Sequence, residues 1–473
     1  MKKIVCLLLV LIMTAASFAA CSKTPGEAVT DSGTNQNETK KQDDPGTITD
    51  PPSGAAENFA NAKNGDILTF GSWDQDGKNG GEPVSWIVLY QGVGKALVLS
   101  EKILEYQCFK NGTDEDKYPR ALYKDSDVRA FLNGEFYNNA FSDEEKAAIL
   151  EAKITSEYKD EKFNELTYET QDKVFLLSRD ETARYVCGVG TYVFGYPTQR
   201  VLDENKYMLS DISNVPGVEE AASWWLRDMG TETPKTAAYV YAASSQRRNY
   251  DEAVYNKAGV RPAMWVVYNA KELEAYEKGE AQPKEDEALN KAIAALKAGD
   301  KLKFGKCDKN AYNMDGYEDI IWTVLSEDNG VLLLISDDQT GSRQFTAKNA
   351  DGTSPDEASW AESDLRKYLN DPKQLDTFFS PQEKAKLVLS HVVSTGEDDR
   401  NGGAETDDYL FIPDQKDIEQ YFSSSSAGIG FKYWLRSQLM WSPRVGCVYN
   451  DGTVSSIDPY EVCGVRLMAR IKK

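Results

Sequence analysis

The sequence has little histidine and little positive charge. His391 is the only histidine among 473 residues, so no histidine-rich zinc site can be built, and a Ser-His-Asp triad could use only that residue. It lies in the apolar, strand-like segment VLSHVVS, where we expect packing rather than catalysis. Lys and Arg total 54 against 76 Asp and Glu, a formal net charge of -22. This balance argues against nucleic acid as a partner and against direct adsorption to anionic lipid.

The first 21 residues, MKKIVCLLLVLIMTAASFAAC, have the pattern of a secretory signal: Lys2 and Lys3, an apolar stretch, and small residues before Cys21. The last four, Phe18–Cys21, resemble the bacterial lipobox. The resemblance implies that residues 1–20 are a lipoprotein signal peptide and that Cys21 becomes a diacylglyceryl cysteine at the new N-terminus. Phe18 stands where leucine is usual, and removal as a plain signal peptide is the alternative. Two acyl chains would anchor the chain stably to a membrane.

A polar segment, residues 21–60, follows the signal. It is rich in Thr, Gly, Asp, Asn, Gln, Pro and Ser and has almost no large apolar residue. Such a composition cannot offset the entropy of ordering, so we expect a flexible, disordered tether between the membrane and the folded part.

Past residue 60 the sequence repeats itself in eight blocks that keep one order. We therefore expect two tandem copies of one domain, residues 61–268 and 297–473, joined by a charged linker with helical pieces, residues 269–296. The matched blocks are NGDILTFGSWD with AGDKLKFGKCD, SWIVL with IWTVL, ALVLS with LLLIS, SDVRAFLN with SDLRKYLN, FSDEEKAAI with FSPQEKAKL, DKVFLLSRDE with DYLFIPDQKD, WWLRD with YWLRS, and GVRPA with GVRLM.

The blocks predict an α+β fold for each copy, with strands, two short helices and a strand-rich end. DILTF, SWIVL and ALVLS are short, β-rich and bounded by Gly and Asp. The apolar spacing in SDVRAFLN predicts a helix that begins near Ser126, and near Ser363 in copy 2. Ser142 with Glu145 is the signature of a capping box, and in copy 2 proline follows the matching serine, which suits the first helical position.

The closing phrases GVRPAMWVV and GVRLMARI are predicted to be equivalent single strands. We expect Gly259 and Gly464 to allow close approach at the start of each strand. Arg261 and Arg466 should each reach an acidic or carbonyl partner inside their own copy. Along the first strand, Val260, Pro262 and Met264 should point to one face.

The string WWLR…AYV…GVRPA, with EPVSWIVL upstream and FSDEEKAAI between, resembles domain-of-unknown-function family 6273, which is common in surface proteins of Gram-positive gut bacteria. That family in turn looks distantly like the formylglycine-generating enzymes and the C-type-lectin fold. Copy 2 departs at Leu467, which replaces the proline after GVR, and it has no PT stretch before YWLRS. The resemblance implies a fold and a surface location and no activity.

The cysteines do not meet the pattern of the formylglycine-generating enzymes, which bind copper with a closely spaced pair. Cys447 and Cys463 are 16 residues apart, and copy 1 has no cysteine in the matching segment. A structural disulfide between them suits an exported protein, and free buried thiols are the alternative. DQDGKNGGE, from Asp74 to Glu82, looks like a calcium loop but lacks the full spacing, and a polar Gly-rich turn has the same appearance. We expect no cofactor.

An insertion in copy 1 is the first candidate for ligand binding, because long insertions on a rigid scaffold often carry function. Asp172 and Trp225 are 53 residues apart and their counterparts Asp408 and Trp434 are 26 apart, so copy 1 has 27 additional residues. Arginines that recur in both copies could grip a carboxylate or could be buried struts of the fold. The candidate ligand-binding residues are Tyr192, Tyr196, Arg200, Trp224 and Arg227.

The first functional hypothesis is a non-catalytic, lipid-anchored bacterial surface protein that binds an extracellular glycan or protein. Two alternatives remain open. One is a structural spacer without a ligand, and the other is an oxygen- and metal-dependent enzyme of the formylglycine-generating type.

Overall fold

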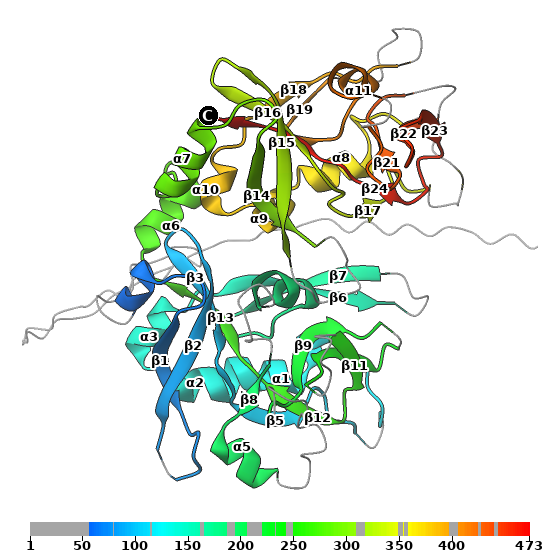
Figure 1. Ribbon diagram of the computed structural model, residues 1–473. Coiled ribbons are helices and arrows are strands. Elements are labelled where there is room, and N and C mark those ends of the chain that lie inside the picture. Colours follow the sequence, from blue (N-terminus) through cyan, green and yellow to red (C-terminus); the bar gives the residue numbers. More distant parts are fainter. Residues whose placement is uncertain are drawn as a thin grey trace, which may run out of the picture. The chain divides into compact units, whose positions relative to one another are not determined.

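Figure 1 shows the computed structural model, in which the described residues, from Ala56 onward, belong to one compact unit. The signal peptide, Cys21 and nearly all of the tether lie outside the described residues, as does Tyr192 of the insertion. The structure describes residues 56–473 apart from 79, 114–115, 161–164, 187–193, 206–219, 232, 243–248, 309–316, 349–352, 354–357, 397–404, 424–426 and 439–442.

The first repeat contains two main sheets. One has the strand order β1-β2-β3-β13 and the other β11-β10-β9-β12-β5. In chain order, the helices and strands up to the end of the first repeat are η1 (Glu57–Asn61), β1 (Ile67–Trp73), β2 (Glu82–Gln91), β3 (Lys95–Ser100), β4 (Lys102–Ile103), β5 (Glu105–Cys108), η2 (Tyr123–Asp125), α1 (Asp127–Phe131), η3 (Leu132–Phe136), α2 (Tyr137–Ala140), α3 (Asp143–Ala148), β6 (Ala152–Lys159), β7 (Glu165–Asp172), α4 (Arg179–Glu181), η4 (Thr182–Val186), β8 (Tyr196–Pro197), α5 (Gln199–Glu204), β9 (Trp224–Met229), β10 (Thr236–Val240), β11 (Asn249–Ala253), β12 (Lys257–Val260) and β13 (Ala263–Val267).

The second repeat has two corresponding sheets, and its first sheet has one additional edge strand, β20. Its first sheet is β14-β15-β16-β25-β20 and its second is β17-β24-β21-β22-β23. The linker and second repeat contain α6 (Ala270–Glu277), α7 (Glu287–Ala294), β14 (Lys301–Cys307), β15 (Glu318–Asp328), β16 (Val331–Ser336), β17 (Ser342–Arg343), α8 (Asp364–Leu369), α9 (Pro372–Phe378), α10 (Pro381–Lys384), β18 (Ser390–Val392), β19 (Thr406–Asp408), β20 (Leu410–Phe411), α11 (Gln415–Tyr421), β21 (Tyr433–Trp434), β22 (Val445–Val448), β23 (Val454–Ile457), β24 (Cys463–Gly464) and β25 (Met468–Lys472).

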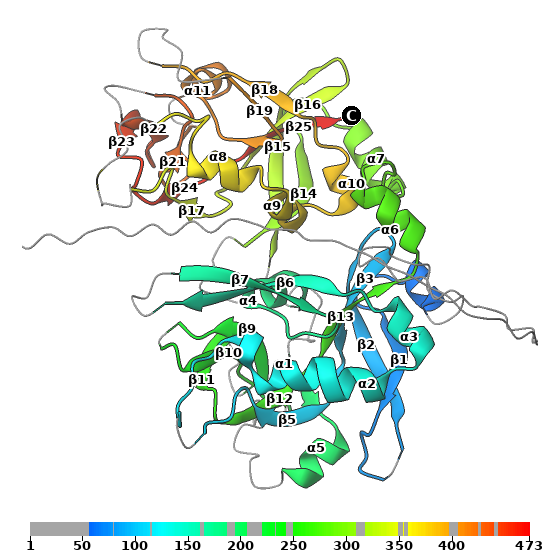
Figure 2. The ribbon, with the colours of Figure 1, turned by 180° about the vertical axis from the view of Figure 1, so that it is seen from behind.

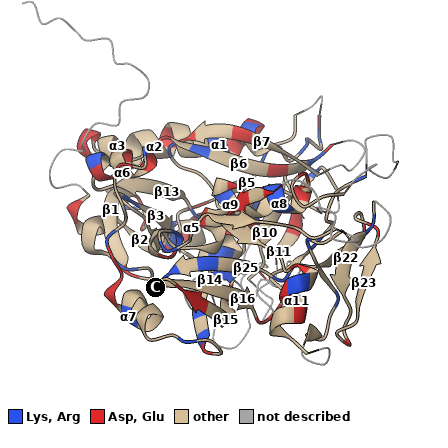
Figure 3. Cartoon of the chain, turned by 90° about the horizontal axis from the view of Figure 1, so that it is seen from above, with Lys and Arg blue, Asp and Glu red and all other residues tan. Residues whose placement is uncertain are grey.

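The tandem layout expected from the eight blocks is therefore present as two mixed, strand-rich units with matching topology. In each, one strand of the second sheet runs parallel to its neighbour: Gly259 on β12 faces Trp224 on β9, and Gly464 on β24 faces Tyr433 on β21. In Figure 3 residues of both charge signs are interspersed on elements of both repeats.

The closing phrases are not single strands, which corrects the expectation for them. Each phrase leaves the second sheet and joins the first, as β12 then β13 and as β24 then β25, with the arginine between the two strands. The expected alternation of Val260, Pro262 and Met264 along one strand is therefore wrong, because the chain changes sheets at this point. A β-carbon on Gly259 would lie 2.6 Å from the side chain of Ile103, so the expected close approach of this glycine is confirmed.

The helix starts are confirmed in both repeats. The hydroxyls of Ser126 and Ser363 accept hydrogen bonds from the amides three residues later. The capping box at Ser142 is present, and the matching one at Ser380 has proline at the first helical position. In Figure 2, α1, η3 and α2 follow one another as one run, and α2 contacts β1.

Each repeat has more helix than the sequence predicted. Ser178 caps α4 and Asp414 caps α11, both with capping boxes, in segments that had been expected to lead directly into strands. In these two blocks the serine or aspartate is followed three residues later by Glu181 or Asp417. This spacing is the same helix-start signal that identified Ser142.

The linker divides between the two repeats. Leu273 of α6 is buried with Val267 and Ala270, beside the end of repeat 1. Ile293 of α7 is buried in the core of repeat 2. The helical pieces expected in the linker are therefore present, and α7 packs as part of the second repeat.

Candidate functional site

The loop between β1 and β2 folds on its own carboxylates. Asp74 Oδ1 accepts a hydrogen bond from the Gly77 amide at 2.8 Å, and Glu82 Oε2 accepts one from the Gln75 amide at 2.7 Å. Asp76 accepts from the Lys78 amide at 2.9 Å, and the Lys78 ammonium lies 3.2 Å from the same side chain. Oxygens of Asp74, Asp76 and Glu82 all lie within 4.8 Å of one another, so they are grouped as cation ligands would be. Each of the three carboxylates accepts a hydrogen bond from a backbone amide of the loop, so a structural role in shaping the loop explains all three.

Arg200 of the insertion holds this loop against repeat 1. Its backbone amide donates to Gln75 O at 2.8 Å, and its Nε donates to Asp74 O at 2.9 Å. Its Nη2 donates to Leu104 O at 2.8 Å and to Glu105 Oε2 at 2.9 Å. Its Nη1 also donates to Glu204 Oε2 at 3.1 Å. With five internal partners and a side chain only 12% exposed, Arg200 acts as a strut that positions the loop.

Tyr196 lies beside the loop through a short strand pair. In the parallel pairing of β4 with β8, Tyr196 faces Lys102, and the Thr198 amide donates to Ile103 O at 3.1 Å. Tyr196 is 38% exposed. The described part of the insertion therefore adds a strand and a helix to repeat 1 and presents one aromatic ring to solvent next to a lysine.

A cavity of about 370 Å³, here named the α5 pocket, lies where the insertion meets the loop. Within the described residues, the Glu101 carboxylate and the Lys102 ammonium have neither a hydrogen bond nor an ion pair, so both can bind a ligand. The lining residues are Gln75, Asp76, Glu82, Pro83, Ser85, Glu101, Lys102, Leu104, Thr198 and Gln199. No sequence pattern pointed to Glu101 and Lys102, which follow the matched block ALVLS directly and have Asp337 and Asp338 as counterparts.

Two of the candidate ligand-binding residues lie in the core, away from this pocket. Trp224 is fully buried, and the Arg261 guanidinium lies 4.8 Å from its ring centroid. Arg227 is 4% exposed, pairs with Glu181 through both terminal nitrogens and donates to Leu176 O at 2.8 Å.

The recurrent arginines have equivalent internal partners in both repeats. The Nε atoms of Arg129 and Arg366 each lie 2.7 Å from a buried aspartate, Asp172 and Asp408. Arg227 and Arg436 each pair with the third residue of a helix, Glu181 and Asp417.

Arg261 and Arg466 donate to Ser100 O and Ser336 O, at 3.1 and 2.9 Å from Nε. These equivalent environments support the interpretation of the recurrent arginines as struts of the fold.

The expected disulfide is absent from the structure, where Cys447 and Cys463 are both free and buried. Cys447 lies on β22 and Cys463 on β24, and β21 runs between these strands. Two strand spacings come to about 9.5 Å, whereas a disulfide spans α-carbons about 7 Å apart at most. The bond would require the sheet to move.

His391 does not pack in the core, which corrects the expectation for VLSHVVS. It lies on β18, where the neighbouring Ser390 and Val392 are buried, so the two-residue period of the strand turns the imidazole outward. Its Nδ1 is 3.3 Å from Asp407 and its Nε2 is 3.1 Å from Glu405, and its side chain is 60% exposed.

Comparison with known proteins gives one match. The family model described as domain of unknown function DUF6273 matches residues 93–268 and 329–473, one segment in each repeat. The curated proteins contain no match, and neither do the solved structures. In the described part of the chain, every helix is too short or too polar to cross a membrane.

Proposed function

The chain belongs to the DUF6273 family, and because the family description assigns no activity, we propose from the residues themselves that it is a lipid-anchored bacterial surface protein that binds an extracellular glycan without catalysis. The anchor would be the diacylglyceryl group on Cys21, and the polar segment after it would hold the folded unit away from the membrane. The ligand site would be the α5 pocket of repeat 1.

The proposal rests on one observation: two segments that are far apart in the chain pack against each other. The insertion of copy 1 packs on the loop at Asp74, and together they line the α5 pocket. The wall offers carboxylate, ammonium, amide and hydroxyl groups, and Tyr196 lies next to Lys102. Polar groups that form hydrogen bonds, together with an amphipathic ring, are the groups that bind sugar hydroxyls and the face of a pyranose.

A finer fold assignment belongs to the same proposal. We infer that each repeat is related to the C-type-lectin-like fold and, more distantly, to the formylglycine-generating enzymes. Support comes from the two-sheet arrangement with helices between the early and late strands, together with the motifs that suggested the resemblance. An enzyme of the copper-dependent type is the weaker alternative, since Cys447 and Cys463 are separated by a strand.

The test is a glycan array probed with the soluble chain from Ser22 onward, which contains the whole compact unit. Binding should fall in Tyr196→Ala and in Glu101→Gln. The matched control is Tyr250→Ala, since Tyr250 is 40% exposed on β11 of the same repeat. If the chain bound immobilised surface proteins and no glycan on the array, the ligand would be a protein and the glycan proposal would be wrong.

Further outcomes separate the remaining alternatives. No binding to either class would favour the structural spacer, and stoichiometric copper or iron in the purified chain would favour an enzyme. Membrane attachment is tested separately, because Cys21→Ala should release the chain into the medium.

A further inference from the structure

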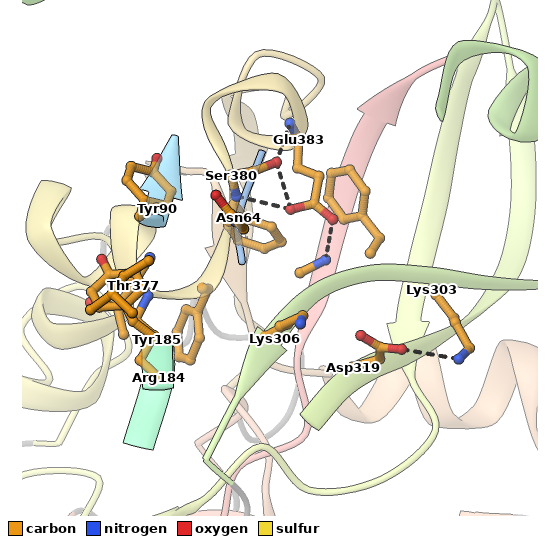
Figure 4. A pocket seen from close by; sticks show the side chains of 15 residues that line it. Asn64, Tyr90, Arg184, Tyr185, Lys303, Lys306, Asp319, Thr377, Ser380 and Glu383 are labelled. Atoms are coloured by element: carbon orange, nitrogen blue, oxygen red, sulfur yellow. Dashed lines mark hydrogen bonds and ion pairs between the residues drawn. The ribbon is translucent and has the colours of Figure 1, made fainter. Parts of the chain in front are cut away.

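A second cavity lies between the repeats and is here named the inter-repeat pocket (Figure 4). It has a volume of about 190 Å³. Repeat 1 contributes Tyr90, Arg184 and Tyr185, and repeat 2 contributes residues of β14 and of the α9–α10 region. No sequence pattern pointed to it, because its walls come from segments that are far apart in the chain and meet only in the folded protein.

The acidic side chains at this pocket are already paired. Glu383 accepts hydrogen bonds from the Gly305 amide at 2.7 Å and from the Ser380 amide at 2.9 Å. Asp319 pairs with Lys303 at 3.0 Å. Glu383 keeps its charge, because its partners are neutral amides, but within the described residues neither carboxylate forms an ion pair with Arg184 or Lys306.

Two cations of the wall have no carboxylate paired with them. Figure 4 joins Lys303 to Asp319 by a dashed line, whereas no such line reaches Arg184 or Lys306. Within the described residues neither Arg184 nor Lys306 forms an ion pair. Of the acids that precede Arg184 in its own segment, Asp180 binds the Tyr317 hydroxyl and interacts with Arg184 electrostatically without forming an ion pair, and Glu181 binds Arg227. Arg184 and Lys306 line the same cavity, so both can contact one bound anion.

Aromatic rings form the adjoining wall. The Arg184 guanidinium lies 4.8 Å from the ring centroid of Tyr185, and the rings of Tyr185 and Tyr90 are 5.6 Å apart. Burial raises the pKa of both phenols, that of Tyr185 to about 12, so both remain protonated hydrogen-bond donors at physiological pH. Cations and protonated phenols together suit a ligand that carries both a negative charge and a ring or chain.

We propose that the inter-repeat pocket binds a small organic carboxylate of about the size of one sugar residue, with Arg184 and Lys306 contacting the carboxylate and Tyr90 and Tyr185 packing against the remainder. The guanidinium fork matches the two carboxylate oxygens. Because Arg184 belongs to repeat 1 and Lys306 to repeat 2, the bound anion joins the two repeats. This site is separate from the α5 pocket and does not depend on it.

The experiment is calorimetric titration of the soluble chain from Ser22 onward with D-glucuronate, with D-glucose as the neutral counterpart. Glucuronate should bind and glucose should not. Lys306→Gln should weaken glucuronate binding about ten-fold, the equivalent of one charge-assisted hydrogen bond. Arg184→Lys keeps the charge but loses the fork, so it should also weaken binding.

The matched control is Lys301→Gln. Lys301 lies on the same strand β14 but outside the pocket, it pairs with Asp337 at 2.7 Å, and its loss changes the net charge equally. It should leave the affinity unchanged. Equal weakening by Lys301→Gln and Lys306→Gln, equal binding of glucose, or absence of glucuronate binding would each overturn the proposal. Retention of glucuronate binding in Tyr196→Ala would confirm that the two pockets are independent.

Discussion

Glu181 closes the capping box of α4 and also neutralises Arg227. Its Oε2 accepts a hydrogen bond from the Ser178 amide at 3.0 Å, and both of its oxygens accept from the Arg227 guanidinium. Burial opposes the charge of Arg227, but Glu181 outweighs it and raises the pKa of the guanidinium. Asp417 does the same in repeat 2, where its Oδ2 accepts from the Asp414 amide and from Arg436, both at 2.7 Å. A local helix cap and a buried ion pair therefore depend on one side chain in each repeat.

Removing the charge of Glu181 should therefore be costly. Glu181→Gln leaves Arg227 buried without its carboxylate, and we expect unfolding free energy to fall by about 3 kcal/mol. Urea unfolding followed by tryptophan fluorescence measures the change. The matched control is Glu144→Gln, an exposed acid in the first turn of α3, which should change stability by no more than about 0.5 kcal/mol. Indistinguishable midpoints for the two variants would show that the ion pair adds nothing to the fold.

A positive φ at Gly305 creates the bulge in β14 that brings its amide to Glu383. The register of β14 shifts between Lys303 and Lys306, and φ of Gly305 is 75°. A β-carbon at this position would lie 2.6 Å from the Phe379 ring. Gly330 has a similar φ of 76°, and a β-carbon added there would have no neighbour within 4 Å. A substitution at Gly330 therefore measures the backbone strain alone, without a clash.

Gly330→Ala should cost about 1 kcal/mol, and Gly305→Ala should cost about 2 kcal/mol more because of the clash. The comparison uses the shift in urea midpoint for each variant. Equal losses at the two positions would mean that the ring moves aside and that only backbone strain matters.

The buried thiols should be inert in the folded protein. Burial raises the pKa of Cys447 to about 11 and that of Cys463 to about 12. Cys108 is only half-buried, although burial also raises its pKa. At pH 8 iodoacetamide should modify Cys108 before the other two, and intact mass under non-reducing conditions should show no disulfide between Cys447 and Cys463. A mass lower by two hydrogens, mapped to these two cysteines, would show that the disulfide forms and that the thiols are not free.

The same pKa shifts predict the direction of pH dependence. Thiols in the unfolded chain ionise near pH 8.5, so the folded state holds these protons more tightly. The stabilisation is complete below about pH 8.5 and is lost as the pH rises toward 11 and 12. Unfolding free energy should therefore decline over this alkaline range, and Cys463→Ala should reduce the slope. An unchanged slope would assign the decline to other groups.

The sequence by itself determined the features that depend on residues close together in the chain. Short, β-rich segments predicted strands such as β3 and β16, and the spacing of Ser142 and Glu145 predicted a helix start. The repetition of blocks in one order predicted two units, and their equivalent strands have the same order, with β20 added in repeat 2. These features persist because capping and strand patterning act over a few residues and survive wherever the segment is placed.

Only the tertiary structure decided which polar residues remain available to a ligand. Arg200 and the Asp74 carbonyl are 126 positions apart, and no local pattern foretold that Arg200 would hold the loop there. The sequence also could not separate the internally paired Arg227 from Arg184, which forms no ion pair among the described residues. The physical reason is that the use of a charged side chain depends on burial and on the partner that folding brings to it, and both are set by segments distant in the sequence.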